Sequence, residues 1–423
     1  MKVDGNHHNS NGNSKNVSFL DLQTLHQDLE SELVACFRHA LSTAEFIGGS
    51  ALESFEQAFA EYCGTQYCVG VGSGTDALRL AILAARIQAG SVILTVPNTF
   101  IATSEAITQA GCLPEFIEVD EQTSNIDVNR LRDYLKKKCQ KDPGTDRLVS
   151  KRTGRPVAAI IPVHLYGAMA DMDGILQLAE RYGLRVIEDA CQAHGAQYLS
   201  RKDGEWHRAG SMGIAAAFSF YPGKNLGACG EAGAVTTNDP EIAHRVRMLR
   251  DHGQSQKYYH DAEGYNARLD SIQAAILHCK LAHLPTWNSK RREAADRYRT
   301  LLSVAQPPSI LLPSYPHEVE SVYHLYVVRV PDRDRVRARL ASAGIGTGIH
   351  YPIPLHLQQA YSKLGYHIGD FPVAEKLAAE ILSLPMFPGL RLEQQLRVAA
   401  EVINAAELAP SLDATTAEQL IAS

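Results

Sequence analysis

Short apolar runs alternate with helical segments along the first two thirds of this chain. The runs expected to form strands are 67–71, 92–96, 113–119, 157–165, 184–189 and 215–220. Amphipathic segments such as 172–182 fill the gaps between them. This alternation is typical of an α/β fold with a doubly wound, largely parallel sheet. Such sheets bind ligands at the carboxyl ends of their strands, so the residues that follow each run are the first candidates for a functional site.

The length of the chain predicts more than one folding unit. A single hydrophobic core rarely serves 423 residues, so we expect a large and a smaller lobe. Ser50 and Glu53 are expected to form a capping box at the start of a helix in the N-terminal arm. Residues 374–382 are expected to form a helix of the smaller lobe. The expected divisions are a disordered tail at 1–16, a large domain with an N-terminal helical arm at 17–280, a small α+β domain at 281–410, and a tail at 411–423.

Charge and cysteine usage exclude several classes of protein. The formal net charge is −6 and no long basic run occurs, so neither nucleic acid nor a membrane surface is an expected partner. No run approaches the roughly 20 apolar residues of a spanning helix, and we expect a soluble, cytoplasmic protein. The eight scattered cysteines lack paired CxxC spacing and are predicted to be reduced core thiols. No metal site is expected, because His7 and His8 lie in the polar tail.

A glycine turn follows the first predicted strand and opens a helix. In Gly72-Ser73-Gly74-Thr75-Asp76-Ala77, backbone amides and the helix dipole would converge on an anion. The turn also fits the loose G-x-G-x-x-A dinucleotide fingerprint, which requires an acidic residue about 20 positions later. Between Leu78 and Ser104 there is no Asp or Glu. We therefore favour a single phosphate over a dinucleotide, with a plain glycine turn as the remaining alternative.

Two strand ends and one turn carry further candidates. Phe100 follows the strand at 92–96 and could cover a planar ring, and Asp189 ends the strand at 184–189, where a protonated pyridine nitrogen would be a suitable partner. Lys224 lies 35 residues after Asp189 in an aromatic, glycine-rich turn. Phe218, Phe220 and Tyr221 would supply apolar surroundings that lower its pKa, as a Schiff-base lysine requires. Taken alone, Lys224 would be predicted to be an exposed loop lysine, because lysines are mostly surface residues.

Several ordered motifs resemble the DegT/DnrJ/EryC1/StrS family of pyridoxal-phosphate-dependent sugar aminotransferases over roughly residues 17–410. The resemblance implies the aspartate aminotransferase fold (fold type I), with a mostly parallel mixed sheet in the large domain and a smaller α+β C-terminal domain. The motifs are VGSGTDAL at 71–78, PNTFIAT at 97–103, VHLYG at 163–167, EDACQAHGA at 188–196, SFYPGKNLGA at 219–228, GYNARLDSIQAAIL at 264–277 and GIHYPIPLHLQ at 348–358.

The resemblance also implies a role for each matching residue. Lys224 would form the Schiff base with pyridoxal 5'-phosphate (PLP) and shuttle protons, and Asp189 would keep the pyridine nitrogen protonated. Phe100 would stack on the ring and Gln192 would bind the ring hydroxyl. The phosphate would be held by Gly74, Thr75 and Ser219, joined by Asn266 from the second subunit of a homodimer with shared active sites. The candidates for substrate contact are Tyr221, His350 and Tyr351.

The resemblance finally implies a substrate class. The SFYPGKNLGA turn resembles that of enzymes that aminate C3 of dTDP-3-keto-6-deoxyhexoses. Glutamate is the expected amino donor, with glutamine as the alternative. Amination of a keto-inositol or of C4 of a ketosugar is the alternative. A non-catalytic regulator would have no reason to retain Lys224, Asp189 and Gln192 together. Cys191 and Glu231 depart from the residues usual in the family.

Overall fold

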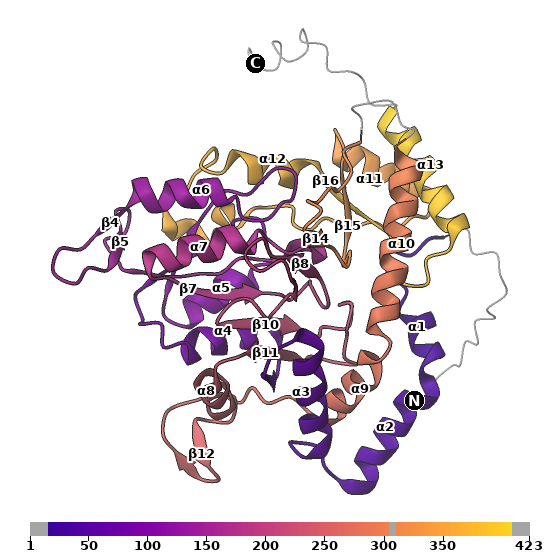
Figure 1. The fold of residues 1–423 in the computed structure, drawn as a ribbon. Helices are drawn as coiled ribbons and strands as arrows, with labels where there is room; N and C mark the ends of the chain where they lie inside the picture. The colour runs from indigo at the N-terminus through magenta and orange to yellow at the C-terminus, as the bar shows by residue number, and fades with distance from the viewer. Residues whose placement is uncertain (1–15, 304–309, 408–423) are drawn as a thin grey trace.

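The computed structural model describes residues 16–303 and 310–407, and its centre is a seven-stranded mixed sheet (Figure 1). The five strands from β10 (Ala215–Ser219) to β3 (Leu113–Phe116) all run parallel, whereas β11 (Gly233–Thr237) is antiparallel to both of its neighbours, β1 and β10. The predicted α/β fold with a mostly parallel sheet is therefore confirmed. The spatial order is β1 (Tyr67–Val71), β11 (Gly233–Thr237), β10 (Ala215–Ser219), β7 (Arg185–Asp189), β6 (Val157–Ile160), β2 (Val92–Thr95) and β3 (Leu113–Phe116).

Helices cover both faces of this sheet, which buries alternate strand residues in two separate cores. Ile187 and Ala217 point into the core under α4, α5 and α8, whereas Val186 and Ala216 point into the core under α3 and α7. Figure 1 shows α4 and α8 on one side of the sheet and α7 on the other. The helices up to residue 281 are α1 (Leu22–Asp28), α2 (Glu30–Thr43), α3 (Ser50–Cys63), α4 (Gly74–Ala84), α5 (Ala102–Gln109), α6 (Val128–Asp133), α7 (Met172–Tyr182), α8 (Pro240–Arg250) and α9 (Ser271–Leu281).

After α9 the described chain builds a third core around the long helix α10, whereas Ala374 and Leu377 of α12 pack into the core under α3 and α7. Tyr298 of this helix packs against Tyr326 of a two-stranded antiparallel sheet, and Val17 of the N-terminal segment joins the same core. The elements of this part are α10 (Leu284–Leu302), β15 (Tyr326–Arg329), α11 (Arg333–Ser342), α12 (Pro372–Glu380), β16 (Ile381–Leu384) and α13 (Leu392–Glu407). The domain boundary near residue 280 stays a prediction.

Short strands and helical turns make up the loops. The strands are β4 (Cys139–Lys141), β5 (Leu148–Ser150), β8 (Gln197–Leu199), β9 (Trp206–Arg208), β12 (Gln254–Gln256), β13 (Tyr259–His260) and β14 (Val319–Glu320). The helical turns are Tyr134–Lys138, Leu165–Gly167, Leu355–Leu357 and Gln359–Leu364. No helix in residues 16–303 or 310–407 is long and apolar enough to cross a membrane.

Four local predictions need correction or lie outside these ranges. Gly49, not Ser50, is the N-cap of α3, and no side chain caps this helix. The helix expected at 374–382 ends at Glu380, and the apolar residues that follow form β16. Four of the eight free cysteines are buried, whereas Cys229 is exposed and Cys36, Cys191 and Cys279 are partly exposed. The tails at 1–16 and 411–423 lie outside the described residues, apart from Asn16.

Candidate functional site

A cavity of about 620 Å³ opens at the carboxyl ends of β7 and β10. The N-terminal segment contributes Phe19 and Leu20 to its wall, and the segment after β16 contributes Met386. Its lining therefore comes from segments far apart in the sequence. Ten of the eleven residues singled out from the sequence line it, namely Gly74, Thr75, Phe100, Asp189, Gln192, Ser219, Tyr221, Lys224, His350 and Tyr351.

Asn266 is the eleventh residue and does not line the cavity of its own chain. It is exposed, lies between β13 and α9, and forms a backbone bridge with Asp251. This position is compatible with a contact to a second copy of the chain. Its role in a neighbouring subunit stays a prediction.

The N-terminus of α4 forms one wall of the cavity. Ser73 caps this helix by accepting a hydrogen bond from the amide of Asp76, whereas the first amides of any helix lack an intrahelical acceptor. Gly74 packs so closely against β10 that a Cβ atom there would lie 2.6 Å from Cβ of Ser219. Only glycine fits this position without a shift of the strand. The helix dipole, the free amides and the Ser219 side chain together suit an anion.

Asp189 lies at the end of β7 with 5% of its surface exposed. Its Oδ2 accepts a hydrogen bond of 2.7 Å from Oγ1 of Thr103, and its Oδ1 accepts one of 3.2 Å from the amide of Cys191. A carboxylate offers about four acceptor positions, so capacity remains for a donor in the cavity. Thr103 belongs to the PNTFIAT motif but was not among the residues predicted to form the site.

Lys224 is presented by a tight turn after β10. The backbone amide of Lys224 donates a hydrogen bond to the carbonyl of Tyr221 at 2.8 Å. The amide of Ala228 donates one to the carbonyl of Phe220 at 2.8 Å and closes the turn. Phe218 and Phe220 do not surround the lysine as expected, because both are wholly buried against Phe59 in the core. Burial nevertheless lowers the pKa of Lys224, while Cys191 and Asp189 oppose this shift. A lowered pKa favours the neutral amine that acts as a nucleophile or base.

Three histidines around Lys224 are held in the neutral form. Burial, followed by the charge of Lys224, lowers the pKa of His194 to about 3 and that of His350 to about 4, and shifts the pKa of His324 well below its usual value. His324 lines the cavity and its Nδ1 contacts Oδ1 of Asn225 at 3.3 Å. The sequence did not single out His324, because a lone histidine beside a strand gives no local signal.

Aromatic rings form the wall opposite the lysine turn. Phe100 is 54% exposed, and its ring centroid lies 5.7 Å from that of Tyr351, so one face of the ring is free to stack. Gln192 donates from Nε2 to the hydroxyl of Tyr351 at 3.1 Å and accepts from the amide of Tyr166 at 2.7 Å. His350 is bound at Nδ1 to Oγ of Ser383 at 2.8 Å and stacks on Phe19. These contacts fix the wall before any ligand binds.

The donor set fits PLP group by group. The start of α4 and Ser219 suit a phosphate, Phe100 suits an aromatic ring, Asp189 suits a protonated ring nitrogen, and Lys224 suits an aldehyde. No competing metal site is evident, since residues 16–303 and 310–407 contain no group of three His, Cys, Asp or Glu side chains placed to hold an ion.

The chain is similar to proteins of known family. A model of the DegT/DnrJ/EryC1/StrS aminotransferase family matches residues 27–403. The erythromycin biosynthesis sensory transduction protein EryC1 of Saccharopolyspora erythraea is 43% identical over 89% of this chain and 96% of its own. The dTDP-3-amino-3,4,6-trideoxy-alpha-D-glucose transaminase of Streptomyces venezuelae is 42% identical over 94% of this chain and 98% of its own.

A solved structure shares the fold and contains a cofactor. The structure of NtdA from Bacillus subtilis, with bound cofactor PMP, superimposes with a TM-score of 0.82 at 30% sequence identity. The match covers 95% of this chain and 87% of that one. The predicted fold type is therefore confirmed.

Proposed function

The chain belongs to the DegT/DnrJ/EryC1/StrS aminotransferase family, and on this basis we propose that it transfers the amino group of glutamate to a nucleotide-linked ketosugar. It is a PLP-dependent aminotransferase. The observation that carries the proposal is the single cavity in which Lys224, Asp189 and the start of α4 meet. We propose C3 of a dTDP-3-keto-6-deoxyhexose as the aminated carbon, in line with the transaminase relative from Streptomyces venezuelae.

We assign the chemical steps to two side chains. When bound, PLP supplies a ring that accepts the electron pair released as the donor's Cα–H bond breaks. Lys224 would take that proton at Nζ and deliver it to the other carbon bonded to the transferred nitrogen. The lowered pKa of Lys224 suits this proton transfer, because it favours the neutral amine. Asp189 would accept a hydrogen bond from the protonated ring nitrogen, while Thr103 and the Cys191 amide hold the carboxylate in place.

The other contacts orient the cofactor and exclude water from one face of it. Gly74 and Thr75 at the helix N-terminus, together with Ser219, would bind the phosphate. Phe100 would stack on the ring, and Gln192 would donate to the ring hydroxyl. Tyr221, His350 and Tyr351 also line the cavity and would contact the substrate.

Charge supports a homodimer with shared sites. The cofactor phosphate, glutamate and a nucleotide sugar are all anionic, yet Lys224 is the one Lys or Arg among the described residues that line the cavity, and Glu231 adds a negative charge. We propose that a second subunit completes the site through Asn266. An exposed apolar stripe on α2 and the loop after it suits that contact; its residues are Val34, Phe37, Leu41, Phe46 and Ile47.

Two alternative functions compete with this one. A keto-inositol or a C4 ketosugar would use the same residues, so only substrate trials distinguish them. A regulatory role, which the name of the Saccharopolyspora erythraea relative implies for that protein, would not need a partly buried lysine of lowered pKa near a carboxylate. We place the reaction in the cytoplasm, since all eight cysteines are free.

A two-step experiment tests the proposal. The purified protein is loaded with PLP, and its visible absorbance is followed while glutamate is added without an acceptor. Loss of the visible band, with formation of 2-oxoglutarate, is the expected result of the first half-reaction. A dTDP-3-keto-6-deoxyhexose should then restore the band and yield an amino sugar detectable by mass spectrometry. A PLP-loaded protein that transfers no amine from glutamate would contradict the proposed reaction.

A further inference from the structure

Glu188 is a wholly buried carboxylate next to Asp189 on β7. Neighbouring residues of a strand point to opposite faces of the sheet, so Asp189 faces the cavity while Glu188 faces the core on the other side. An isolated buried carboxylate is strongly unfavourable unless donors surround it. The proposed reaction assigns no role to this residue, nor to His164 of the VHLYG motif.

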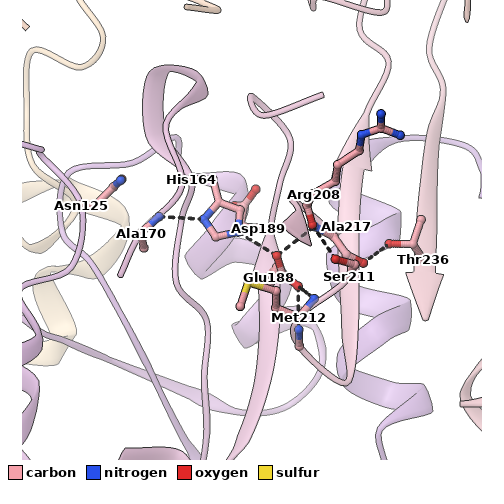
Figure 2. A network of polar contacts seen from close by, with 12 residues as sticks. Asn125, His164, Ala170, Glu188, Asp189, Arg208, Ser211, Met212, Ala217 and Thr236 are labelled. Atoms are coloured by element: carbon pink, nitrogen blue, oxygen red, sulfur yellow. Dashed lines mark hydrogen bonds and ion pairs between the residues drawn. The ribbon is translucent and has the colours of Figure 1, made fainter. Parts of the chain in front are cut away.

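Four N–H groups converge on this carboxylate. Its Oε2 accepts from Nε2 of His164 at 2.9 Å and from the amide of Gly210 at 2.8 Å. Its Oε1 accepts from the amides of Met212 at 2.8 Å and Gly213 at 2.7 Å. Figure 2 shows the carboxylate between the His164 ring and the turn that contains Met212.

The tautomer of His164 follows from its second contact. Its Nδ1 accepts a hydrogen bond from the amide of Ala170 at 3.2 Å, so the ring proton is on Nε2 and is donated to Glu188. Burial alone would raise the pKa of Glu188, but the hydrogen bond from His164 and those from the amides hold it below the usual value. Glu188 is therefore an ionised acceptor with no donor of its own to offer.

The three segments joined at Glu188 each lead to a residue that lines the cavity, namely Val163, Asp189 and Ser219. The turn at 210–213 leads directly into β10, which ends at Ser219 and continues to Lys224. His164 binds Glu188 with its ring and the carbonyl of Asp189 with its backbone amide at 3.0 Å. In the parallel pairing of β7 with β10, Ala217 lies opposite Asp189. The carboxylate thus fixes where β10 begins relative to β7.

We propose that Glu188 is a positioning residue for the cofactor site. Its ionised carboxylate acts through β10 and the His164 loop to fix the distance between Asp189, which holds the ring nitrogen, and Ser219 with Lys224, which hold the other end of the cofactor. This inference rests on the proposed PLP-dependent function. It gives a role to the first residue of the EDACQAHGA motif and to the histidine of VHLYG.

The decisive variant is Glu188→Gln, which keeps the shape of the side chain. Each oxygen of Glu188 accepts two N–H groups, so in either orientation the new amide nitrogen would face two donors. We expect the dissociation constant for PLP to rise at least about tenfold. The measurement is a PLP titration of the cofactor-free protein, combined with the melting temperature of each cofactor-free variant.

A matched control separates positioning from general loss of stability. Glu115 on β3, the edge strand of the sheet, is 1% exposed and accepts hydrogen bonds from the hydroxyls of Ser150 and Thr153. Glu115→Ala should lower the melting temperature while leaving PLP affinity unchanged. If Glu188→Gln melts earlier but binds PLP as tightly as the wild type, Glu188 is merely structural and the proposal is wrong.

A second variant decides the matter if Glu188→Gln does not fold. His164→Asn removes one of the four donors and keeps the backbone contact to Asp189, and we expect PLP affinity to fall about threefold or more. Unchanged affinity would overturn the proposal. If the wild-type protein binds no PLP, the proposed function is overturned as well. If the wild type binds PLP normally and the Glu188 and His164 variants bind it with the same affinity, only the role of Glu188 is overturned.

Discussion

Thr103 in the first turn of α5 donates a hydrogen bond of 2.7 Å to the carboxylate of Asp189 at the end of β7. A second threonine, Thr99, contacts Thr103 at 3.0 Å through its hydroxyl, so the donor is itself held in place. Both threonines are buried. The loop after β2 therefore orients the carboxylate at the end of β7.

Replacing Thr103 by valine should lower kcat/KM by roughly ten- to a hundredfold, because a hydrogen bond to a charged group contributes about 1.5–3 kcal/mol. Valine keeps the shape of threonine and removes only the hydroxyl. Thr103→Ser restores the hydroxyl and should recover most of the activity. If the valine and serine variants are equally active, the hydroxyl does not support Asp189.

Replacing Lys224 by alanine should abolish transamination while the protein stays folded. The general base alone accounts for about 10²–10⁴ in rate, and the covalent link to the cofactor is lost as well. The visible absorbance of lysine-bound PLP should disappear, and borohydride should no longer attach the cofactor to the chain. A variant that keeps both its circular dichroism and its turnover would remove Lys224 from the mechanism.

Replacing Phe100 by alanine should weaken PLP binding by roughly two- to tenfold, since an aromatic pair contributes about 0.5–1.5 kcal/mol beyond its buried area. The ring is 54% exposed, so its loss should cost little stability in the cofactor-free protein. Phe100→Tyr should bind PLP normally. Equal PLP affinity in the alanine variant would argue that this ring does not stack on the cofactor.

The pH dependence of stability should report the buried His194. Burial and the charge of Lys224 lower its pKa to about 3, whereas the unfolded chain titrates near 6.5. Between these values the unfolded state binds the proton that the folded state excludes, so stability is full above 6.5 and falls with decreasing pH by about 1.4 kcal/mol per unit. The stability lost through His194 stops increasing near the pKa that this residue has in the folded protein.

His194→Gln isolates that contribution, because the longer glutamine amide reaches about as far as Nε2 and can still donate to the carbonyl of Ser219, which Nε2 of His194 contacts at 2.9 Å. The measurement is chemical unfolding of the cofactor-free wild type and variant between about pH 7 and 5. The stability difference should shift in favour of the variant as the pH falls. A difference that stays constant across this range would show that His194 does not titrate on unfolding.

The sequence predicted the parts of the site that local patterns encode. The strand at 184–189 ends at Asp189 in the structure, and the glycine turn at 72–74 precedes a helix, because apolar runs and helix starts are set by neighbouring residues. Thr103 and His324 were missed because their roles depend on how segments far apart in the sequence come together in the fold. β16 was missed for the same reason, since its pairing with β15 spans more than 50 residues.

Subunit complementation provides the sharpest test of a shared site. Lys224→Ala and Asn266→Ala should each yield inactive or weakly active homodimers, one for lack of the base and one for lack of the contact across the interface. In a mixed dimer, one site combines the intact Lys224 of one subunit with the intact Asn266 of the other. The two variants are mixed in equal amounts, unfolded and refolded together, so that about half of the dimers contain one subunit of each kind. Each mixed dimer has one intact site out of two, so the mixture should regain about a quarter of wild-type activity. If Asn266 acted within its own subunit, every site in the mixture would carry one defect, and no activity would return.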